Sequence, residues 1–335
     1  MKKLLIISVS TFYGGGESFI TNTLTSLQNY FDVYYIVRDG TLYDFLPKNK
    51  RYKFKNNSFI NQINEVKEII NKLSISITIL NGGRTLFFTP FLKNKTKNIM
   101  YVHSTNKSVP VIKRLIYILL IHYCYIFANK VIHVSDYSKN QQKIVNKNSI
   151  RIYNGVDILP YKERSFSLPL RFLFLGRTGK SKGIDIIIKS FEKIPENTAI
   201  LNIVGSGEYD NKILKLKNKN IFYHGFKKDT SFYYDSNDIF ITLSKIENCS
   251  LSILDALNNS MPVITTRAGG NVELVNAFNG FLIKRNVKIL LHTINEIIQN
   301  PNCLIELGKN ANKTAVNKFN KSDTVLYITD VINSL

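Results

Sequence analysis

Two acidic residues stand eight positions apart in segment 244–273 (SKIENCSLSILDALNNSMPVITTRAGGNVE) and could contact two ends of one ligand. Glu247 follows a short apolar run, and Asp255 lies in a stretch with helical apolar spacing. Eight helical residues would span about 12 Å, whereas glycosidase carboxylates stand roughly 5–9.5 Å apart across one bond. The spacing therefore favours an elongated ligand, such as a nucleotide sugar. The alternative is that Glu247 caps a helix and Asp255 is only solvated.

The loop at 176–183 (GRTGKSKG) lies between an apolar run and a helical pattern, and Arg177 and Lys182 flank its small residues. Arg177 and Lys182 could bind a diphosphate and neutralise the charge that develops on it as a leaving group. Gly269 and Gly270 would let backbone N–H groups approach an anion. The sequence contains no D-x-D, H-E-x-x-H or Cys/His cluster, so we expect chemistry without a metal ion. A solvated basic turn is the alternative.

The length and charge of the chain indicate two domains and an anionic partner. A chain of 335 residues exceeds what one hydrophobic core usually supports. The net charge of +21 is uneven, because residues 1–165 hold 24 Lys and Arg against 9 Asp and Glu. Such a domain suits phosphate-bearing substrates, an anionic membrane surface or nucleic acid, unless it reflects only Lys and Asn enrichment. No recognised nucleic-acid module is present, so we expect no nucleic-acid partner.

Cysteine usage and the first residues favour a cytoplasmic location. Cys124, Cys249 and Cys303 are far apart in the sequence and form no C-x-x-C pair, which is typical of a reducing compartment. The opening MKKLLIISVS imitates a signal peptide, but its apolar run is short and no small-residue cleavage site follows. We expect it to form the first buried strand.

Apolar strands alternate with helical patterns along the whole chain, which predicts an α/β fold with parallel sheets. The first domain is expected at 1–157, a linker at 158–169 and the second domain at 170–320. A C-terminal helix at 321–335 is expected to pack back toward the first domain. The result would be two Rossmann-like domains facing each other across a cleft, with ligands beyond the carboxyl ends of the strands. The expected strands are at 4–9, 32–37, 75–80, 99–103, 130–134, 171–175, 199–204, 221–224, 239–242, 262–265 and 280–283.

The most apolar run, residues 115–128 (LIYILLIHYCYIFA), is flanked by Lys113 and Arg114 on one side and Lys130 on the other. It is too short to span a bilayer, which needs about 20 residues. A buried core helix is the favoured interpretation. The alternative is a helix that dips one face into an anionic membrane interface.

Nine segments, in order, resemble the family 4 glycosyltransferases, which are retaining enzymes with the GT-B fold. The resemblance extends over almost the whole chain. The segments are GGGE at 14–17, VSDYS at 134–138, NGVD at 154–157, GRTGKSKG at 176–183, VGSGE at 204–208, HGF at 224–226, ENCSLSILDAL at 247–257, PVITTRAGGNVE at 262–273 and NGFL at 279–282.

The resemblance implies a role for each matching residue. Arg177 and Lys182 would hold the donor diphosphate, Glu247 would contact the transferred sugar, and His103 would lie on the acceptor side. Asp255 takes the position at which the family usually has a glutamate that reaches the ribose. Because Asp255 is one methylene shorter, it would need a closer helix or a bridging water. The remaining donor-binding residues implied are Gly15, Gly16, Gly205, Phe226, Asn248, Ser250 and Leu251.

The resemblance further implies a metal-independent, retaining hexosyl- or N-acetylhexosaminyltransferase that needs no cofactor. Its donor would be a UDP- or GDP-sugar, and its acceptor a glycan or a lipid-linked glycan in bacterial surface polysaccharide synthesis. The enzyme would be cytoplasmic, with peripheral binding to the inner face of the cell membrane left open. Two alternatives stay open at this point. One is a sugar-nucleotide epimerase of the same architecture, and the other is a non-catalytic basic protein that binds nucleic acid.

Overall fold

The computed structural model describes residues 1–11, 13–103, 111–141 and 148–335, without the side chains of 111–114. The chain divides into two compact units. Unit 1 comprises Met1–Gly155 and Lys321–Leu335, and unit 2 comprises Val156–Asn320. The predicted linker, 158–169, thus belongs to unit 2, and the C-terminal helix belongs to unit 1.

The described part of unit 1 is built on a seven-stranded parallel sheet in the order β3-β2-β1-β4-β5-β6-β7. Strands β2 and β3 lie on one side of β1, and β4 to β7 lie on the other side. The strand order therefore reverses between β1 and β4. Ligands of open α/β sheets bind at such a switch point. The strands are β1 (Lys3–Ile7), β2 (Asp32–Val37), β3 (Arg51–Lys53), β4 (Ile77–Asn81), β5 (Lys97–Val102), β6 (Lys130–His133) and β7 (Ser149–Arg151).

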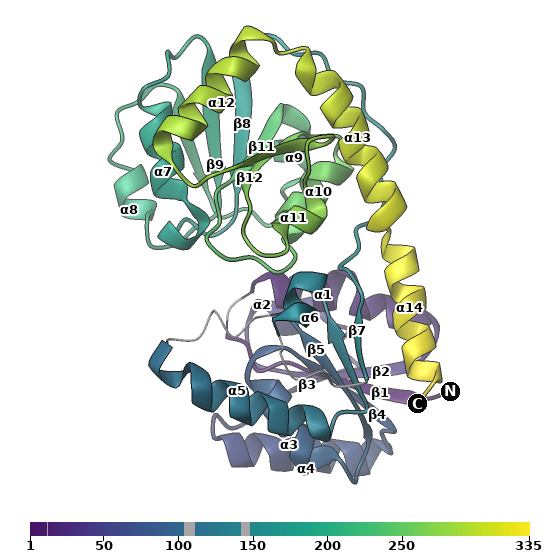
Figure 1. Ribbon diagram of the computed structural model, residues 1–335. Helices are drawn as coiled ribbons and strands as arrows, with labels where there is room; N and C mark the ends of the chain where they lie inside the picture. The colour runs from purple at the N-terminus through teal and green to yellow at the C-terminus, as the bar shows by residue number, and fades with distance from the viewer. Residues whose placement is uncertain (12, 104–110, 142–147) are drawn as a thin grey trace. The chain divides into compact units, whose positions relative to one another are not determined.

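Helices cover the sheet of unit 1. One buried core joins α3, η2, α4 and α5 to the sheet through residues such as Ile63, Phe88 and Cys124, and Figure 1 shows α3, α4 and α5 gathered together. The final helix α14 packs on η1. The helices among the described residues are α1 (Gly15–Asn22), η1 (Leu24–Asn29), α2 (Thr41–Phe45), α3 (Phe59–Leu73), η2 (Gly83–Phe88), α4 (Thr89–Leu92), α5 (Val111–Ile126), α6 (Asp136–Asn140) and α14 (Lys321–Asn333), where η marks a 3-10 helix.

Unit 2, all of it described, repeats this plan with a six-stranded parallel sheet in the order β10-β9-β8-β11-β12-β13. The order reverses between β8 and β11, which are hydrogen-bonded neighbours. All six strands contain apolar residues, and those in the middle of the sheet are the most buried because both faces are covered there. They are β8 (Leu170–Leu175), β9 (Ala199–Val204), β10 (Ile221–Gly225), β11 (Ile239–Thr242), β12 (Val263–Thr266) and β13 (Gly280–Ile283).

The helices of unit 2 bury apolar stripes against this sheet. In α7, Ile184, Ile187, Ile188 and Phe191 recur at helical spacing, and all four enter the core. The helices are η4 (Lys180–Lys182), α7 (Ile184–Phe191), α8 (Asp210–Ile213), α9 (Ser231–Ser236), α10 (Leu251–Asn258), α11 (Asn271–Leu274), α12 (Val287–Gln299) and α13 (Cys303–Lys318).

Two short strands, β3 and β7, are absent from the sequence prediction. Each has three residues and lies at an edge of the sheet of unit 1. Their sequences, RYK and SIR, contain no apolar run, because an edge strand is covered on fewer sides than a central one. They are strands only because β3 is hydrogen-bonded to β2 and β7 is hydrogen-bonded to β6.

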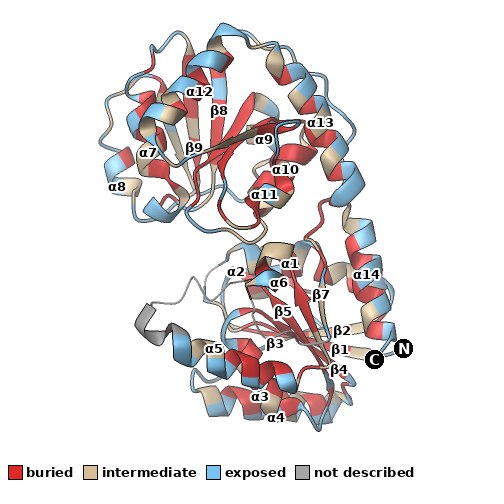
Figure 2. Ribbon diagram, in the orientation of Figure 1, coloured by how far each residue is buried: buried red, intermediate tan, exposed pale blue. Residues whose placement is uncertain are grey.

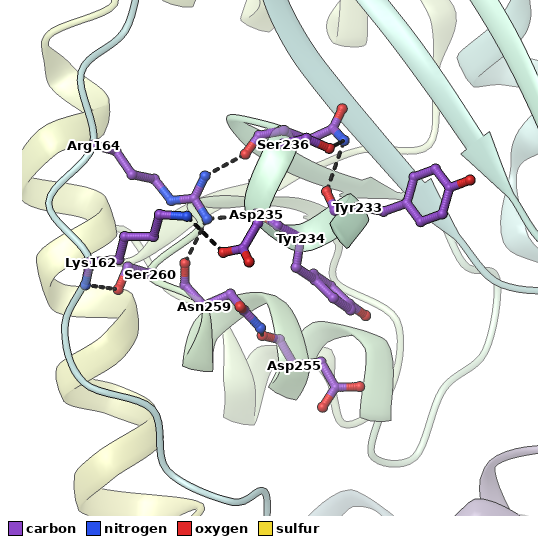
Figure 3. A network of polar contacts seen from close by, with 10 residues as sticks. Lys162, Arg164, Tyr233, Tyr234, Asp235, Ser236, Asp255, Asn259 and Ser260 are labelled. Carbon is purple, nitrogen blue, oxygen red and sulfur yellow. Dashed lines mark hydrogen bonds and ion pairs between the residues drawn. The ribbon is translucent and has the colours of Figure 1, made fainter. Parts of the chain in front are cut away.

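A half-buried arginine holds the segment before β8 against the rest of unit 2. Arg164 donates hydrogen bonds to three backbone carbonyls, those of Asn237 (2.5 Å), Tyr234 (2.8 Å) and Asn259 (2.9 Å). These carbonyls lie at the C-terminal ends of α9 and α10 (Figure 3). Burial lowers the pKa of the guanidinium below its usual value. One cation therefore joins the ends of two helices, where the helix dipole favours positive charge.

We predict that Arg164→Ala lowers the free energy of unfolding of unit 2 by about 3 kcal/mol, because three carbonyls lose a charged donor. Lys162→Ala is the matched control. Lys162 lies two residues away and forms an exposed ion pair with Asp235 (2.7 Å), so its loss should cost less than about 0.5 kcal/mol. Urea denaturation measures both variants, and equal midpoints would contradict the prediction.

Candidate functional site

The switch point of unit 2 brings together two loops that are about 65 residues apart in the sequence. The loop after β8 runs through residues 176–183, and the loop after β11 runs through 243–250. Backbone hydrogen bonds join them, from Leu243 N to Lys182 O (3.0 Å) and from Lys245 N to Ser181 O (2.8 Å). Because β8 and β11 are parallel neighbours, both loops leave the same edge of the sheet.

Gly183 allows this close approach. Its φ is +77°, and a Cβ at this position would lie 2.4 Å from the carbonyl oxygen of Leu243. Only glycine fits a backbone contact of this kind at a positive φ. The glycine that ends the GRTGKSKG segment is thus required for packing the two loops together.

Lys182 and Glu247 form an ion pair across the two loops. The side chains are 27% and 14% exposed, so the pair is partly shielded from water and still in contact with solvent. Ser244 donates a hydrogen bond to the same carboxylate oxygen, Oε1, at 2.9 Å. Gly270 N donates to the backbone oxygen of Glu247 (3.0 Å), which holds the loop after β12 against it. Glu247 is therefore fixed from three directions.

The remaining predicted residues of unit 2 lie on loops and helix starts around this pair. Arg177 is exposed, and its stem lies beside Gly207, where a Cβ would be 3.1 Å from Arg177 Cγ. Ser250 is the N-cap of α10, and Leu251 is its first residue. The first turn of a helix has backbone N–H groups without intrahelical partners, which suit an anion.

Gly205 and Phe226 follow β9 and β10, and Asn248 lies in the loop with Glu247. Gly205 N donates to Gly225 O (2.8 Å), so the ends of these two strands are joined. The side chain of Phe226 is 63% exposed. An exposed aromatic ring at the carboxyl end of a strand is available to stack on a ligand.

Asp255 lies within α10 beside the ring of Tyr234 (Figure 3). The separation of about 12 Å expected from the sequence assumed that a helix runs from Glu247 to Asp255. The helix begins only at Leu251, so this helical rise does not apply to the whole interval. Among the described residues, no hydrogen bond or ion pair to the Asp255 carboxylate is present. The carboxylate is half-buried, and burial raises its pKa from 3.8 to about 7.

We predict that Asp255→Asn changes how stability depends on pH. Between pH 4 and 7 the folded chain keeps its proton on Asp255 while the unfolded chain has lost it, so the free energy of unfolding falls as pH rises through this window. The asparagine variant lacks this term and should gain about 2–4 kcal/mol relative to the wild type by pH 7. Urea denaturation at a series of pH values tests this, and parallel curves would contradict it.

In unit 1, His103 lies at the end of β5, between the loops that follow β1 and β4. A Cβ on Gly16 would be 3.7 Å, and one on Gly82 3.2 Å, from His103 Cδ2. The imidazole stacks on Tyr101 with 5.1 Å between ring centroids. Gly15 and Gly16 begin α1. The switch point of unit 1 thus brings together the histidine and the glycine loop that the sequence predicts as site residues.

Asn81 joins these elements, and the sequence analysis missed it as a site residue. Its Nδ2 donates to Gly16 O (3.0 Å), so its Oδ1 is the acceptor that faces His103 Nε2 at 2.9 Å. This arrangement places the proton of the neutral imidazole on Nε2. Burial lowers the pKa of His103 to about 4, so the ring is neutral at physiological pH. The signal available in the sequence was the position of Asn81 at a strand end, before two glycines.

We predict that Asn81→Asp raises the pKa of His103 by about 1–3 units, because a carboxylate replaces the amide acceptor. In the wild type, the Cε1–H resonance of His103 should not titrate above about pH 5. In the variant it should titrate between about pH 5 and 7.

The matched control is Asn202→Asp, because Asn202 Oδ1 faces His224 Nε2 in the same manner at 2.8 Å. This variant should shift the resonance of His224 and leave that of His103 unchanged. An unaltered His103 titration in Asn81→Asp would contradict the assigned contact.

Two absences hold for the residues that the structure describes. No group of three or more His, Cys, Asp or Glu residues there is placed to hold a metal ion. No helix there is long and apolar enough to cross a membrane.

Sequence comparison relates the chain to known proteins. Residues 159–314 match the family described as Glycosyl transferases group 1. An uncharacterised glycosyltransferase of Methanocaldococcus jannaschii is 32% identical over 220 residues, which cover 62% of this chain and 60% of that protein. The UDP-Gal:alpha-D-GlcNAc-diphosphoundecaprenol alpha-1,3-galactosyltransferase of Escherichia coli is 30% identical over 198 residues, covering 52% of this chain and 49% of that protein. The chain thus matches 60% or less of the length of these two relatives.

Among solved structures, Anabaena HepE in complex with UDP-glucose has a TM-score of 0.87 to this chain at 20% sequence identity. The alignment covers 100% of both chains. A likeness at this identity shows the fold, and the predicted GT-B architecture of two parallel-sheet α/β domains is confirmed.

Proposed function

We propose that the chain, whose residues 159–314 match the group 1 glycosyltransferases, transfers a sugar from a nucleoside diphosphate sugar to a glycan or lipid-linked acceptor. The observation that carries the proposal is the Lys182–Glu247 pair at the switch point of unit 2. It combines a cation suited to a diphosphate with a carboxylate suited to sugar hydroxyls. Both are held by backbone contacts that exist without a ligand.

In this proposal unit 2 binds the donor. Lys182 and Arg177 contact the diphosphate oxygens, and the N–H groups of Ser250 and Leu251 at the start of α10 contribute further donors. Glu247 accepts hydrogen bonds from the transferred sugar. Asp255, protonated up to about pH 7, can both donate to and accept from a ribose hydroxyl, which an ionised carboxylate cannot do.

Transfer is proposed to retain the configuration of the anomeric carbon and to proceed without a metal ion. The bond from that carbon to the diphosphate oxygen breaks, and the acceptor oxygen bonds to the carbon on the same face. The acceptor's proton passes to the departing diphosphate oxygen. Lys182 and Arg177 stabilise the negative charge that develops there, in positions set before the reaction, so little reorganisation is required.

Unit 1 is proposed to serve the acceptor side, with the neutral His103 as a hydrogen-bonding group held by Asn81. Gly15 and Gly16 offer the backbone of the first loop to an oxyanion. The name of the E. coli relative specifies a UDP-sugar and a diphosphoundecaprenol-linked acceptor, and HepE was solved with UDP-glucose. These names support a uridine donor and a hexosyl group. The proposal also includes a cytoplasmic role in surface polysaccharide synthesis.

A donor panel tests the proposal. Purified protein is incubated with UDP- and GDP-hexoses and N-acetylhexosamines, with and without undecaprenyl-diphosphate-linked sugars, and released nucleoside diphosphate is measured. We expect release that depends on both a UDP-sugar and an acceptor. An epimerised sugar formed from donor alone would instead support the epimerase. No binding of any nucleotide sugar, together with salt-dependent retention of nucleic acid, would support the non-catalytic alternative.

A further inference from the structure

Helix α5 of unit 1 has an exposed face that is apolar throughout its described length. Six large apolar side chains of this helix are between 50% and 74% exposed. Their spacing, with neighbours one, three or four positions apart, places them on one side of a helix. They are Leu115, Ile116, Leu119, Leu120, Tyr123 and Ile126, and together they are called the α5 face below.

The opposite side of the same helix is part of the core of unit 1. Ile121, Cys124 and Tyr125 are each at most 3% exposed and belong to the main hydrophobic cluster. Figure 2 shows this division, with exposed and buried residues alternating along α5. The run predicted as a buried core helix is therefore buried on one side only. A surface helix normally carries polar residues on its outer side, and α5 carries apolar ones there.

The charge of the surrounding sequence is of one sign. From residue 69 to residue 135 the chain contains no Asp or Glu, while it contains nine Lys and Arg. Lys93 lies over the ring of Phe127, just after α5, at 4.4 Å from the centroid. Lys130 begins the next strand. The side chains of Lys113 and Arg114 lie outside the described residues. The α5 face is thus apolar, and all charged residues in the surrounding stretch of sequence are cationic.

We propose that the α5 face docks on an anionic lipid bilayer, with its apolar side chains in the interface and the neighbouring cations at the phosphate level. Apolar area on one side of a helix, with basic residues beside it, is the combination that binds such surfaces. A second copy of this chain is the less suitable occupant, because each copy carries +21 and the same acid-free stretch.

The dimensions agree with a helix that lies on the membrane rather than crossing it. Sixteen residues make α5 about 24 Å long, shorter than the roughly 30 Å of the hydrocarbon core. Because one side of α5 is packed against the sheet core, the other side remains for the interface. Docking would keep unit 1 beside acceptors that are anchored in the bilayer.

Vesicle flotation tests this without any substrate, so its outcome is independent of the transfer reaction. The full chain is mixed with vesicles of phosphatidylcholine alone, or with about one third phosphatidylglycerol. We expect the wild type to float with the anionic vesicles and to be released by high salt. Leu119→Glu should reduce the bound fraction about tenfold, because it places a charge in the apolar face.

Leu214→Glu is the matched control, since Leu214 in unit 2 is 68% exposed and lies outside the α5 face. It should bind vesicles as the wild type does, and both variants should melt at the wild-type temperature. Equal flotation of Leu119→Glu and wild type would overturn the proposal, as would equal binding to neutral vesicles. So would a wild-type dimer in light scattering that Leu119→Glu dissociates, because the α5 face would then be a dimer interface.

Discussion

Lys182→Ala should lower kcat/KM for the nucleotide-sugar donor by about 10²–10³-fold. Lys182 is the cation that the fold holds at the switch point, and removal of one preorganised group that stabilises a developing charge has effects of this size. The KM for the donor should rise as well, because in the proposed function the same cation binds the diphosphate before the reaction. Initial rates over a range of donor concentrations separate the two effects.

Glu247→Gln gives a contrasting result in the same assay. The amide keeps the shape of the side chain but removes the charge that neutralises Lys182. Lys182 then interacts more strongly with the diphosphate, so the KM for the donor should stay the same or fall, while kcat drops because a carboxylate contact with the sugar is lost.

Lys180→Ala is the control for both variants, because Lys180 is an exposed lysine of the same loop. It should retain the wild-type rate. Wild-type rates in a folded Lys182→Ala protein, or a donor KM that rises equally in Lys182→Ala and Glu247→Gln, would contradict the assigned roles. Thermal melting shows that each variant is folded.

Gly205→Ala should reduce the free energy of unfolding of unit 2 by about 4 kcal/mol. Gly205 has a φ of +127°, and a Cβ there would lie 1.9 Å from the carbonyl oxygen of Gly176. The clashing atom belongs to the backbone, so a rotamer change cannot relieve it. The loops after β8 and β9 would have to separate, which would also displace Arg177 from its position next to Gly207.

Gly176→Ala is the control that distinguishes the cost of backbone strain from the cost of a steric clash. Gly176 also has a positive φ, +149°, but a Cβ there would meet nothing within 4 Å. It should cost only about 1–2 kcal/mol, the backbone strain alone. Urea denaturation of both variants measures the difference. If the two substitutions cost the same, the close contact between the loops is not present in solution.

The expected architecture followed from local patterns. Continuous apolar runs such as residues 4–9 and 171–175 predict strands covered on both faces, and their alternation with helices predicts parallel sheets. Observed β1 and β8 agree with these runs within a few residues. The edge strands β3 and β7 were missed, because three-residue edge strands need no apolar run and exist only through their neighbours.

Several properties of the candidate site depend on contacts between residues distant in the sequence. The pairing of Lys182 with Glu247 requires β8 and β11 to be neighbours, although β9 and β10 intervene along the chain. The link from Asn81 to Gly16 and His103 likewise joins the ends of β1, β4 and β5. No local pattern specifies which strands pair, so the sequence could supply these residues only as separate candidates.

The sequence alone determined the fold class, the two-domain organisation and the types of group available at strand ends, because apolar periodicity and glycine placement are local properties. Tertiary structure decided which of these groups meet, that Asp255 is buried enough for its pKa to reach about 7, and that α5 turns an apolar face outward. The physical reason is that burial and charge pairing depend on which residues surround a given side chain. These neighbours are determined only by the order in which the strands pair in the folded sheet.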